Sequence, residues 1–263
     1  MTSRIKQFLP AIILILIVLG LLVWYMVMVP APTHTFGTPP TQVASEPAKV
    51  TEDATYYTVD ATYPTATTLS GTADQAAVSA MKGFVEQEIA KFKDNGNFAN
   101  LTHDDVQMLG LDQRKYALGI EYKMYESAST LSYVYQMYQD TGGAHPNTYY
   151  RTFTFDKESG EALELGDVFV PSAKYLETLS VQARSRLPAM IAAMESVSVS
   201  EVDMDYINSG TLPEEDSFQN FYFEGKNLVL LFPPYQIGPY VLGMITLPIP
   251  ASELKELKSA YTK

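Results

Sequence analysis

The sequence predicts an α+β fold: an antiparallel β-meander sheet with segregated helices, behind one N-terminal transmembrane helix and a Pro-rich linker. Three observations predict it. Residues 8–29 form an apolar run, prolines recur through residues 30–50, and residues 116–155 alternate between apolar and polar side chains over three stretches. Alternation with period two indicates half-buried strands, and consecutive strands of this kind form antiparallel sheets. The pattern shows no regular βαβ alternation.

Residues 8–29 predict a membrane anchor. At 1.5 Å of rise per residue this run makes roughly 33 Å of helix, close to the ~30 Å hydrocarbon core. Arg4 and Lys6 precede it, and the next lysine or arginine is Lys49. The positive-inside rule therefore predicts a single pass through the cell membrane, with residues 1–7 cytoplasmic and the C-terminal domain extracytoplasmic. A cleaved signal peptide is the alternative, although its apolar region is usually only about 7–15 residues long.

Residues 30–50 predict an extended spacer, because prolines alternate there with Thr, Ala, Ser and Gln. The composition also limits the partners of the domain that follows. A formal net charge of -12 repels phosphate backbones, so we expect no nucleic acid. The same charge would attract a basic protein, although it also serves solubility alone. The absence of cysteine excludes disulfides, thiolate catalysis and Cys-ligated metals.

The elements of the first half follow from periodicity. A capping box at Thr72 and Gln75 predicts the start of an amphipathic helix, which ends at Asn95-Gly96. Strands are predicted before and after this helix wherever apolar residues alternate: Tyr56–Tyr63, Lys115–Tyr125, Leu131–Tyr138 and Thr148–Phe155. A short strand, Ala162–Leu165, is predicted after the turn at residues 156–161.

The second half mixes both types of element. Ser172 can cap a helix to about Arg186, which Pro188 should break, leaving a further helical piece over residues 189–195. Residues 201–216 are acidic and read as irregular. A hairpin, a returning strand and a terminal helix capped by Ser252 are then predicted, the strands being Phe221–Phe223, Leu228–Phe232 and Val241–Ile249.

Three segments carry a family resemblance: the loop Thr141–Asn147, the stretch Thr152–Phe169 and the stretch Tyr235–Gly243. Together they resemble the extracytoplasmic domain of RsiV-like proteins. Residues 55–130 are similar to the module that precedes it there and in PdaC-type polysaccharide deacetylases. The resemblance implies two parts after the spacer, a PdaC-like module over residues 51–130 and an RsiV-like C-terminal domain over residues 131–263.

The resemblance also implies a cell-envelope binding domain on a single-pass anchor. RsiV-like anti-sigma factors use this domain as a receptor, with lysozyme as a ligand. An anti-sigma factor needs a cytoplasmic domain, and about seven residues precede the predicted span. PdaC-type enzymes carry a separate metal-dependent deacetylase domain, for which this chain leaves no room. We therefore expect the binding part alone, without anti-sigma or deacetylase domains.

The candidate site centres on the loop between the tyrosine-rich strands Leu131–Tyr138 and Thr148–Phe155. Its histidine, His145, is a candidate ligand contact or general base. Alternatively, the glycines before it form a tight turn that His145 closes by a hydrogen bond. We name five candidate ligand-binding residues from this loop and from the Pro/Gly-braced loop near the C-terminus: His145, Asn147, Tyr149, Tyr235 and Tyr240.

No sequence motif declares a reaction, a metal or a cofactor. The acidic groups Asp203, Asp205 and 214–216 lack the spacing of a calcium loop, so we expect a solvated surface there. The leading hypothesis is a membrane-anchored extracytoplasmic binding or sensor domain, not an enzyme, for a lysozyme-like protein or a cell-wall glycan such as a peptidoglycan fragment. The alternatives are a cell-wall hydrolase or deacetylase-like enzyme centred on His145, and a structural envelope protein without a ligand.

Overall fold

The computed structural model describes residues 45–262. The predicted anchor at residues 8–29 and most of the predicted spacer lie outside these residues. Within residues 45–262, none of the helices combines the length and the apolar character that a membrane crossing requires.

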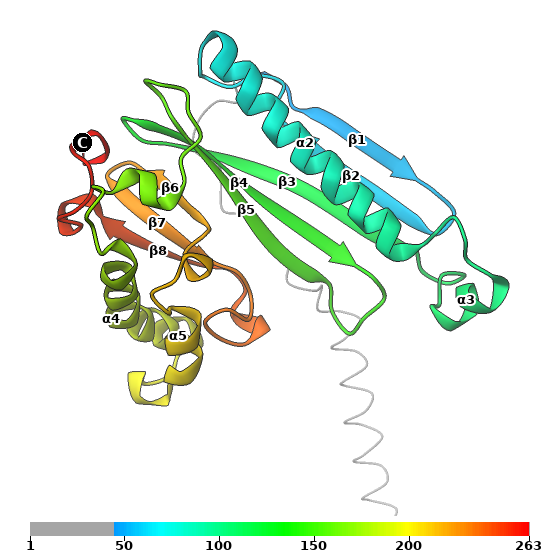
Figure 1. Cartoon of the computed structure of the whole chain (residues 1–263). Coiled ribbons are helices and arrows are strands. Elements are labelled where there is room, and N and C mark those ends of the chain that lie inside the picture. The colour runs from blue at the N-terminus through cyan, green and yellow to red at the C-terminus, as the bar shows by residue number, and fades with distance from the viewer. Residues whose placement is uncertain (1–44, 263) are drawn as a thin grey trace, which may run out of the picture. The chain divides into compact units, whose positions relative to one another are not determined.

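A five-stranded sheet carries the first half of the chain, with strand order β1-β2-β3-β4-β5 (Figure 1). The first strand begins inside the predicted spacer, so ordered structure starts earlier than the proline pattern indicated. The other four strands lie within two residues of their predicted positions. The strands are β1 (Ala48–Asp53), β2 (Tyr57–Tyr63), β3 (Tyr116–Glu126), β4 (Thr130–Asp140) and β5 (Asn147–Asp156).

One strand pair in this sheet is parallel, which the alternation could not reveal. β2 pairs with β3 in parallel register, with Asp60 opposite Gly119, whereas all other neighbours in the sheet are antiparallel. Parallel strands need a long crossover connection. The helices α2 (Gly71–Gly96) and α3 (His103–Met108) provide it, and α3 was not predicted. The sheet is therefore mixed, although antiparallel pairs dominate.

Helix α2 packs on one face of this sheet (Figure 1). Its buried side chains recur at helical spacing, as the sequence predicted. They pack against every second residue of β2, β3 and β4, which are the residues that point to this face. These residues form the first core, which includes Met81, Val85, Ile89, Phe92, Val59, Ala61, Leu118, Ile120, Leu131, Tyr133, Tyr135 and Met137.

A second core lies between a three-stranded sheet and helix α4. The strands β6 (Phe221–Glu224), β7 (Asn227–Phe232) and β8 (Ile245–Pro250) are antiparallel neighbours in that order. Side chains of α4 (Tyr175–Glu195) and α5 (Met204–Gly210) pack against them, with Leu179, Leu187 and Ile207 fully buried. Short 3-10 turns complete the C-terminal half, at Leu165–Val168, Val199–Glu201, Glu215–Ser217, Tyr240–Leu242, Ala251–Glu253 and Ser259–Tyr261.

Helix α4 continues through Pro188, which contradicts the predicted break. Proline removes one intrahelical hydrogen bond and crowds the carbonyl four residues earlier. Here Pro188 is buried, and its helix neighbours Leu187 and Ile191 belong to the second core. Burial of this apolar face against the second sheet offsets the lost bond, so the two predicted pieces form one helix.

Several local predictions are also wrong. Helix α2 begins at Gly71, so the capping box at Thr72 and Gln75 does not form, and Asp74 instead accepts from the hydroxyl of Thr67 at 2.7 Å. The predicted strand at residues 162–165 is reduced to one bridge between Phe155 and Ala162. The strand predicted from residue 241 begins only at Ile245, and the predicted terminal helix is two 3-10 turns. The acidic segment contains α5, whose start is capped by Asp203.

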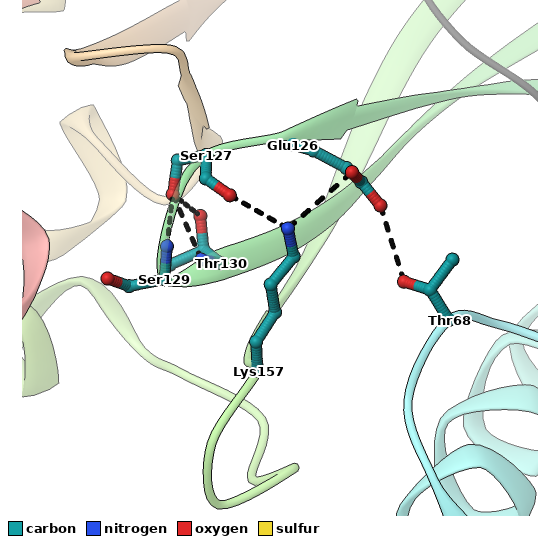
Figure 2. A network of polar contacts seen from close by, with 6 residues as sticks. All are labelled: Thr68, Glu126, Ser127, Ser129, Thr130 and Lys157. Atoms are coloured by element: carbon teal, nitrogen blue, oxygen red, sulfur yellow. Dashed lines mark hydrogen bonds and ion pairs between the residues drawn. The ribbon is translucent and has the colours of Figure 1, made fainter. Parts of the chain in front are cut away.

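Polar contacts hold the β3–β4 turn and join the first sheet to the second. Figure 2 shows the β3–β4 turn, where Lys157 donates to the carbonyl of Ser127 at 2.8 Å and pairs with Glu126 at 3.5 Å. The N–H of Gly225, in the β6–β7 turn, donates to the carbonyl of Glu126 at 3.3 Å. Farther along β5, the hydroxyl of Thr152 accepts from the N–H of Phe221 at 3.1 Å. The second sheet therefore covers only part of the face opposite α2.

Candidate functional site

Three of the five predicted site residues meet at the opposite end of the sheet. The hydroxyl of Tyr235 lies 2.9 Å from Nε2 of His145. The His145 ring stacks on Tyr240, with 4.0 Å between ring centroids and 18° between the planes. Tyr240 also donates its hydroxyl to the carbonyl of Pro146 at 2.8 Å. We call His145, Tyr235 and Tyr240 the aromatic cluster. It joins the β4–β5 loop to the loop before β8.

Local backbone geometry holds the β4–β5 loop in place. Gly142 has a φ of +78°, in the left-handed region that glycine adopts without steric cost. Its N–H donates to the carboxylate of Asp140 at 3.0 Å, and Arg114 binds the same carboxylate. Burial would raise the pKa of Asp140, but the Arg114 guanidinium and the Gly142 N–H outweigh it and hold this pKa below its ordinary value.

The partner loop is braced from behind. The amide of Gln236 donates to the carbonyls of Gly210 at 2.9 Å and Ser217 at 2.8 Å. Tyr235 has a φ of +71°, which is unusual for a residue with a side chain, and the residue is 53% exposed. Such strained residues are found where the surrounding structure fixes them, often at functional sites. The hydrogen bond to His145 is one contact that fixes Tyr235.

Next to the aromatic cluster, the sheet face opposite α2 carries a cavity of about 300 Å³. Cross-strand register arranges its lining in two rows. Asp60, Gly119 and Tyr138 lie side by side on β2, β3 and β4. Glu121 and Gln136 form the next row. Gly119 contributes no side chain, which leaves the hollow between Asp60 and Tyr138.

Tyr138, at the wall of the cavity, lies near the end of β4 that leads into the loop of the aromatic cluster, and we call the cavity and the cluster together the groove. Gln136 pairs with Tyr150 on β5. Burial raises the pKa of Tyr150, and the neighbouring Tyr240 and Glu121 raise it further. Burial likewise raises the pKa of Tyr138, with smaller effects from Asp140 and Tyr240. The groove thus combines tyrosine hydroxyls, two carboxylates and an amide.

The other two predicted site residues lie elsewhere. Asn147 begins β5, opposite Gln139. Tyr149 projects from the sheet face that α2 covers, and its hydroxyl donates to Glu88 at 3.3 Å. Successive residues of a strand point to opposite faces, so Tyr149 and its neighbour Tyr150 serve different sides of the sheet.

Sequence reasoning did not select the sheet residues of the groove. The alternation that placed Tyr133, Tyr135 and Met137 in the core also placed Gln136 and Tyr138 on the opposite face, which was the available signal. No signal indicated Asp60, because its position depends on the parallel β2–β3 pair. Within the described part of the chain, no group of three or more histidines and carboxylates is arranged to hold a metal ion.

Two family models match the chain. Residues 50–148 match a family described as Deacetylase PdaC, and residues 166–252 match a protein family of unknown function, DUF3298. The chain therefore carries a PdaC-type module followed by a DUF3298 domain. The finer assignment to the RsiV type stays a prediction, as do the membrane anchor and the lysozyme-like partner.

Two curated proteins are similar to it. The peptidoglycan-N-acetylmuramic acid deacetylase PdaC of Bacillus subtilis is 29% identical over 187 residues, which cover 70% of this chain and 36% of that protein. Esterase Rv3036c of Mycobacterium tuberculosis is 24% identical over 129 residues, covering 49% and 52% of the two chains. The chain thus spans about a third and about half of the length of these relatives.

Two crystal structures of DUF3298 family proteins share the fold. The protein from Bacteroides fragilis aligns with a TM-score of 0.56 at 19% identity, over 82% of this chain and 93% of that one. The protein from Pseudomonas aeruginosa aligns with a TM-score of 0.55 at 14% identity, over 84% and 97%. At these identities the likeness concerns the fold alone.

The matches to curated proteins correct one prediction. The sequence led us to expect a chain that is not an enzyme. Both curated relatives are named as hydrolytic enzymes, one a deacetylase and the other an esterase. That expectation is therefore wrong, and hydrolytic chemistry has to be considered together with binding.

Proposed function

We propose that this PdaC-type module and DUF3298 domain together recognise N-acetylated cell-wall glycan, and that the groove is the binding site. The observation that carries the proposal is the polar cavity above Gly119, whose wall residue Tyr138 lies near the end of β4 that leads into the loop of the aromatic cluster. Sugar hydroxyls and amides need several donors and acceptors together with apolar ring faces, and the groove offers both.

The shape of the groove supports an extended ligand over a small compact one. The cavity lining spans β2, β3 and β4, and Tyr138 at its wall is 41% exposed. Tyrosine provides contact area at a low cost in side-chain entropy, which is why it is common in binding surfaces. A glycan chain lying across β2, β3 and β4 would reach the aromatic cluster with its next sugar.

Hydrolytic removal of acyl groups from the same glycan is the second candidate. Asp60 and Glu121 both line the cavity, and the two curated relatives are named as a deacetylase and an esterase. One carboxylate would take a proton from water as it adds to the acyl carbonyl, and the other group, as the protonated carboxylic acid, would protonate the leaving nitrogen or oxygen as its bond to carbon breaks. Acetate and the deacylated sugar are the products.

Binding of peptidoglycan oligosaccharides by the full-length chain tests the first candidate. Gly119→Val fills the hollow without backbone strain, because a Cβ there would meet Tyr138 at 3.7 Å, an ordinary contact. We expect Gly119→Val and Tyr138→Ala each to weaken binding roughly tenfold. Tyr206→Ala, which removes a tyrosine of similar exposure from α5, is the matched control. Wild-type affinity in both groove variants would refute the assignment.

Release of acetate from the same oligosaccharides tests the second candidate. Asp60→Asn and Glu121→Gln keep the shape of each side chain and remove its charge. A wild-type turnover that falls at least a hundredfold in either variant would establish hydrolysis at the groove. Turnover that both variants retain would place the chemistry elsewhere in the chain.

A further inference from the structure

A second cleft opens on the other side of the sheet, between α2 and the edge strand β5. Its volume is about 460 Å³. Phe84 of α2 and Tyr149 and Phe153 of β5 supply its aromatic walls. Helix α2 packs mainly over β2, β3 and β4, so the side chains of β5 extend past the helix and leave a trough there. The cleft shares no lining residue with the cavity above Gly119, although Tyr150 of the groove is among the residues that line the cleft.

The cleft is lined by more cations than carboxylates, whereas the whole chain is acidic. The whole chain holds 18 lysines and arginines against 30 acidic residues. The charged residues that line the cleft are Lys91, Arg151 and Glu88, two cations and one carboxylate. In an acidic protein, such a local reversal is where an anion can be held.

The carboxylate of Glu88 is already engaged within the protein. One oxygen accepts from Lys91 at 2.7 Å and the other from the Tyr149 hydroxyl at 3.3 Å. Its side chain is only 11% exposed, whereas that of Lys91 is 55% exposed. Glu88 therefore forms the floor of the cleft, and Lys91 stands at the rim with donors to spare.

Arg151 is the second rim cation. Its guanidinium carbon lies 5.6 Å from the centre of the Phe153 ring. Packing against a ring face orients the guanidinium without using its five N–H donors. Paired donors in a plane match the two oxygens of a carboxylate. The aromatic walls below suit the apolar face of a sugar ring.

We infer that this cleft binds a carboxylate-bearing sugar, with its ring against Phe84 and Phe153 and its carboxylate at Arg151 and Lys91. The inference does not depend on the groove, which lies on the opposite face of the sheet. N-acetylmuramic acid and uronic acids share this chemistry.

Ligand-observed NMR titration of the full-length chain with N-acetylmuramic acid tests the inference. N-acetylglucosamine has the same N-acetylated ring without the lactyl carboxylate, and we expect it to bind roughly tenfold more weakly. Arg151→Gln and Lys91→Gln should each weaken binding of the acid roughly fivefold. Glucuronic acid is the second probe: equal affinity would support recognition of any sugar carboxylate, and weaker binding would support the lactyl acid.

Glu88→Gln should change the affinity in the opposite direction to Arg151→Gln and Lys91→Gln. The amide keeps a hydrogen bond to Tyr149 but removes the charge that repels an anion and holds Lys91. We expect it to tighten binding of N-acetylmuramic acid roughly twofold to fivefold. The groove variant Gly119→Val should leave this affinity unchanged. A wrong assignment of the groove can therefore be distinguished from a wrong assignment of the cleft. Equal binding of both N-acetylated sugars, or weaker binding by Glu88→Gln, would overturn the inference.

Discussion

The hydroxyl of Tyr235 lies 2.9 Å from Nε2 of His145, and these residues belong to different family matches. The contact therefore joins the PdaC-type module to the DUF3298 domain. His145→Ala, Tyr235→Phe and the double variant form a thermodynamic cycle. Because the pair is solvent-exposed, we expect a coupling free energy of about 0.5–1 kcal/mol, measured by urea unfolding. Additive effects of the two substitutions would show that the contact contributes nothing to stability.

Substitution of the paired glycines tests the geometry of the β4–β5 loop. Gly142 has a left-handed φ, and a Cβ there would lie 3.3 Å from the Tyr116 ring. Gly142→Ala should lower the free energy of unfolding by about 1–2 kcal/mol. Gly143 has neither restriction, its nearest neighbour being 3.7 Å away. Gly143→Ala is therefore the matched control and should be nearly neutral in the same unfolding experiment.

Loss of the Asp140 charge should destabilise the protein in a pH-dependent way. The folded pKa of Asp140 lies below its ordinary value, so its contribution to stability is present at neutral pH and is lost as the pH falls through that lower pKa. We expect Asp140→Asn to lower the melting temperature by about 1–3 °C at pH 7. The difference from wild type should shrink as the pH falls below the ordinary carboxyl pKa of about 3.9 and vanish below the lowered pKa of the folded state.

Asp53→Asn is the control for this pH effect. Asp53 also pairs with a cation, Lys115, but its side chain is 73% exposed. Because solvent screens this ion pair, the Asp53→Asn variant should have almost the same melting temperature as the wild type at pH 7. If Asp140→Asn showed the same loss at acidic and neutral pH, the charge would not be the cause.

Removing the hydroxyl of Tyr135 should stabilise the fold. Tyr135 is completely buried, and among the described residues its hydroxyl finds no hydrogen-bond partner. A buried polar group without a partner costs free energy, so Tyr135→Phe should raise the free energy of unfolding by about 1 kcal/mol. Tyr149→Phe loses a bond to Glu88 and should lower it by a similar amount. Urea unfolding of both variants measures the difference in sign.

The strands were the most predictable part of this fold. Tyr116 to Met124 alternates strictly, because one face of β3 packs on the first core. Helix α4 was harder to predict. The local sequence shows the energetic cost of Pro188, but it does not show the burial against the second sheet that offsets this cost. The capping box at Thr72 failed for a similar reason: Asp74, between its two members, bonds to the preceding loop instead.

The candidate site could be predicted only in part. Rare residues in tight loops identified His145, Tyr235 and Tyr240, and the structure brings all three together. We selected Tyr149 because it lies in a tyrosine-rich strand. Its position in the alternation of that strand places it on the sheet face that α2 covers. Asp60 reaches the groove through long-range parallel pairing, which one sequence does not reveal.

The parallel pair in the five-stranded sheet also bears on how the protein assembles. β3, β4 and β5 are joined by short turns, so their contacts close small loops at low entropic cost. β2 can join β3 only after residues 64–115 have folded back across the sheet, which makes this the costly step. During synthesis β1 and β2 emerge first, yet they must wait for a partner strand that is made much later. Until then their unpaired edge is exposed, and this interval is when the chain is most open to misassembly.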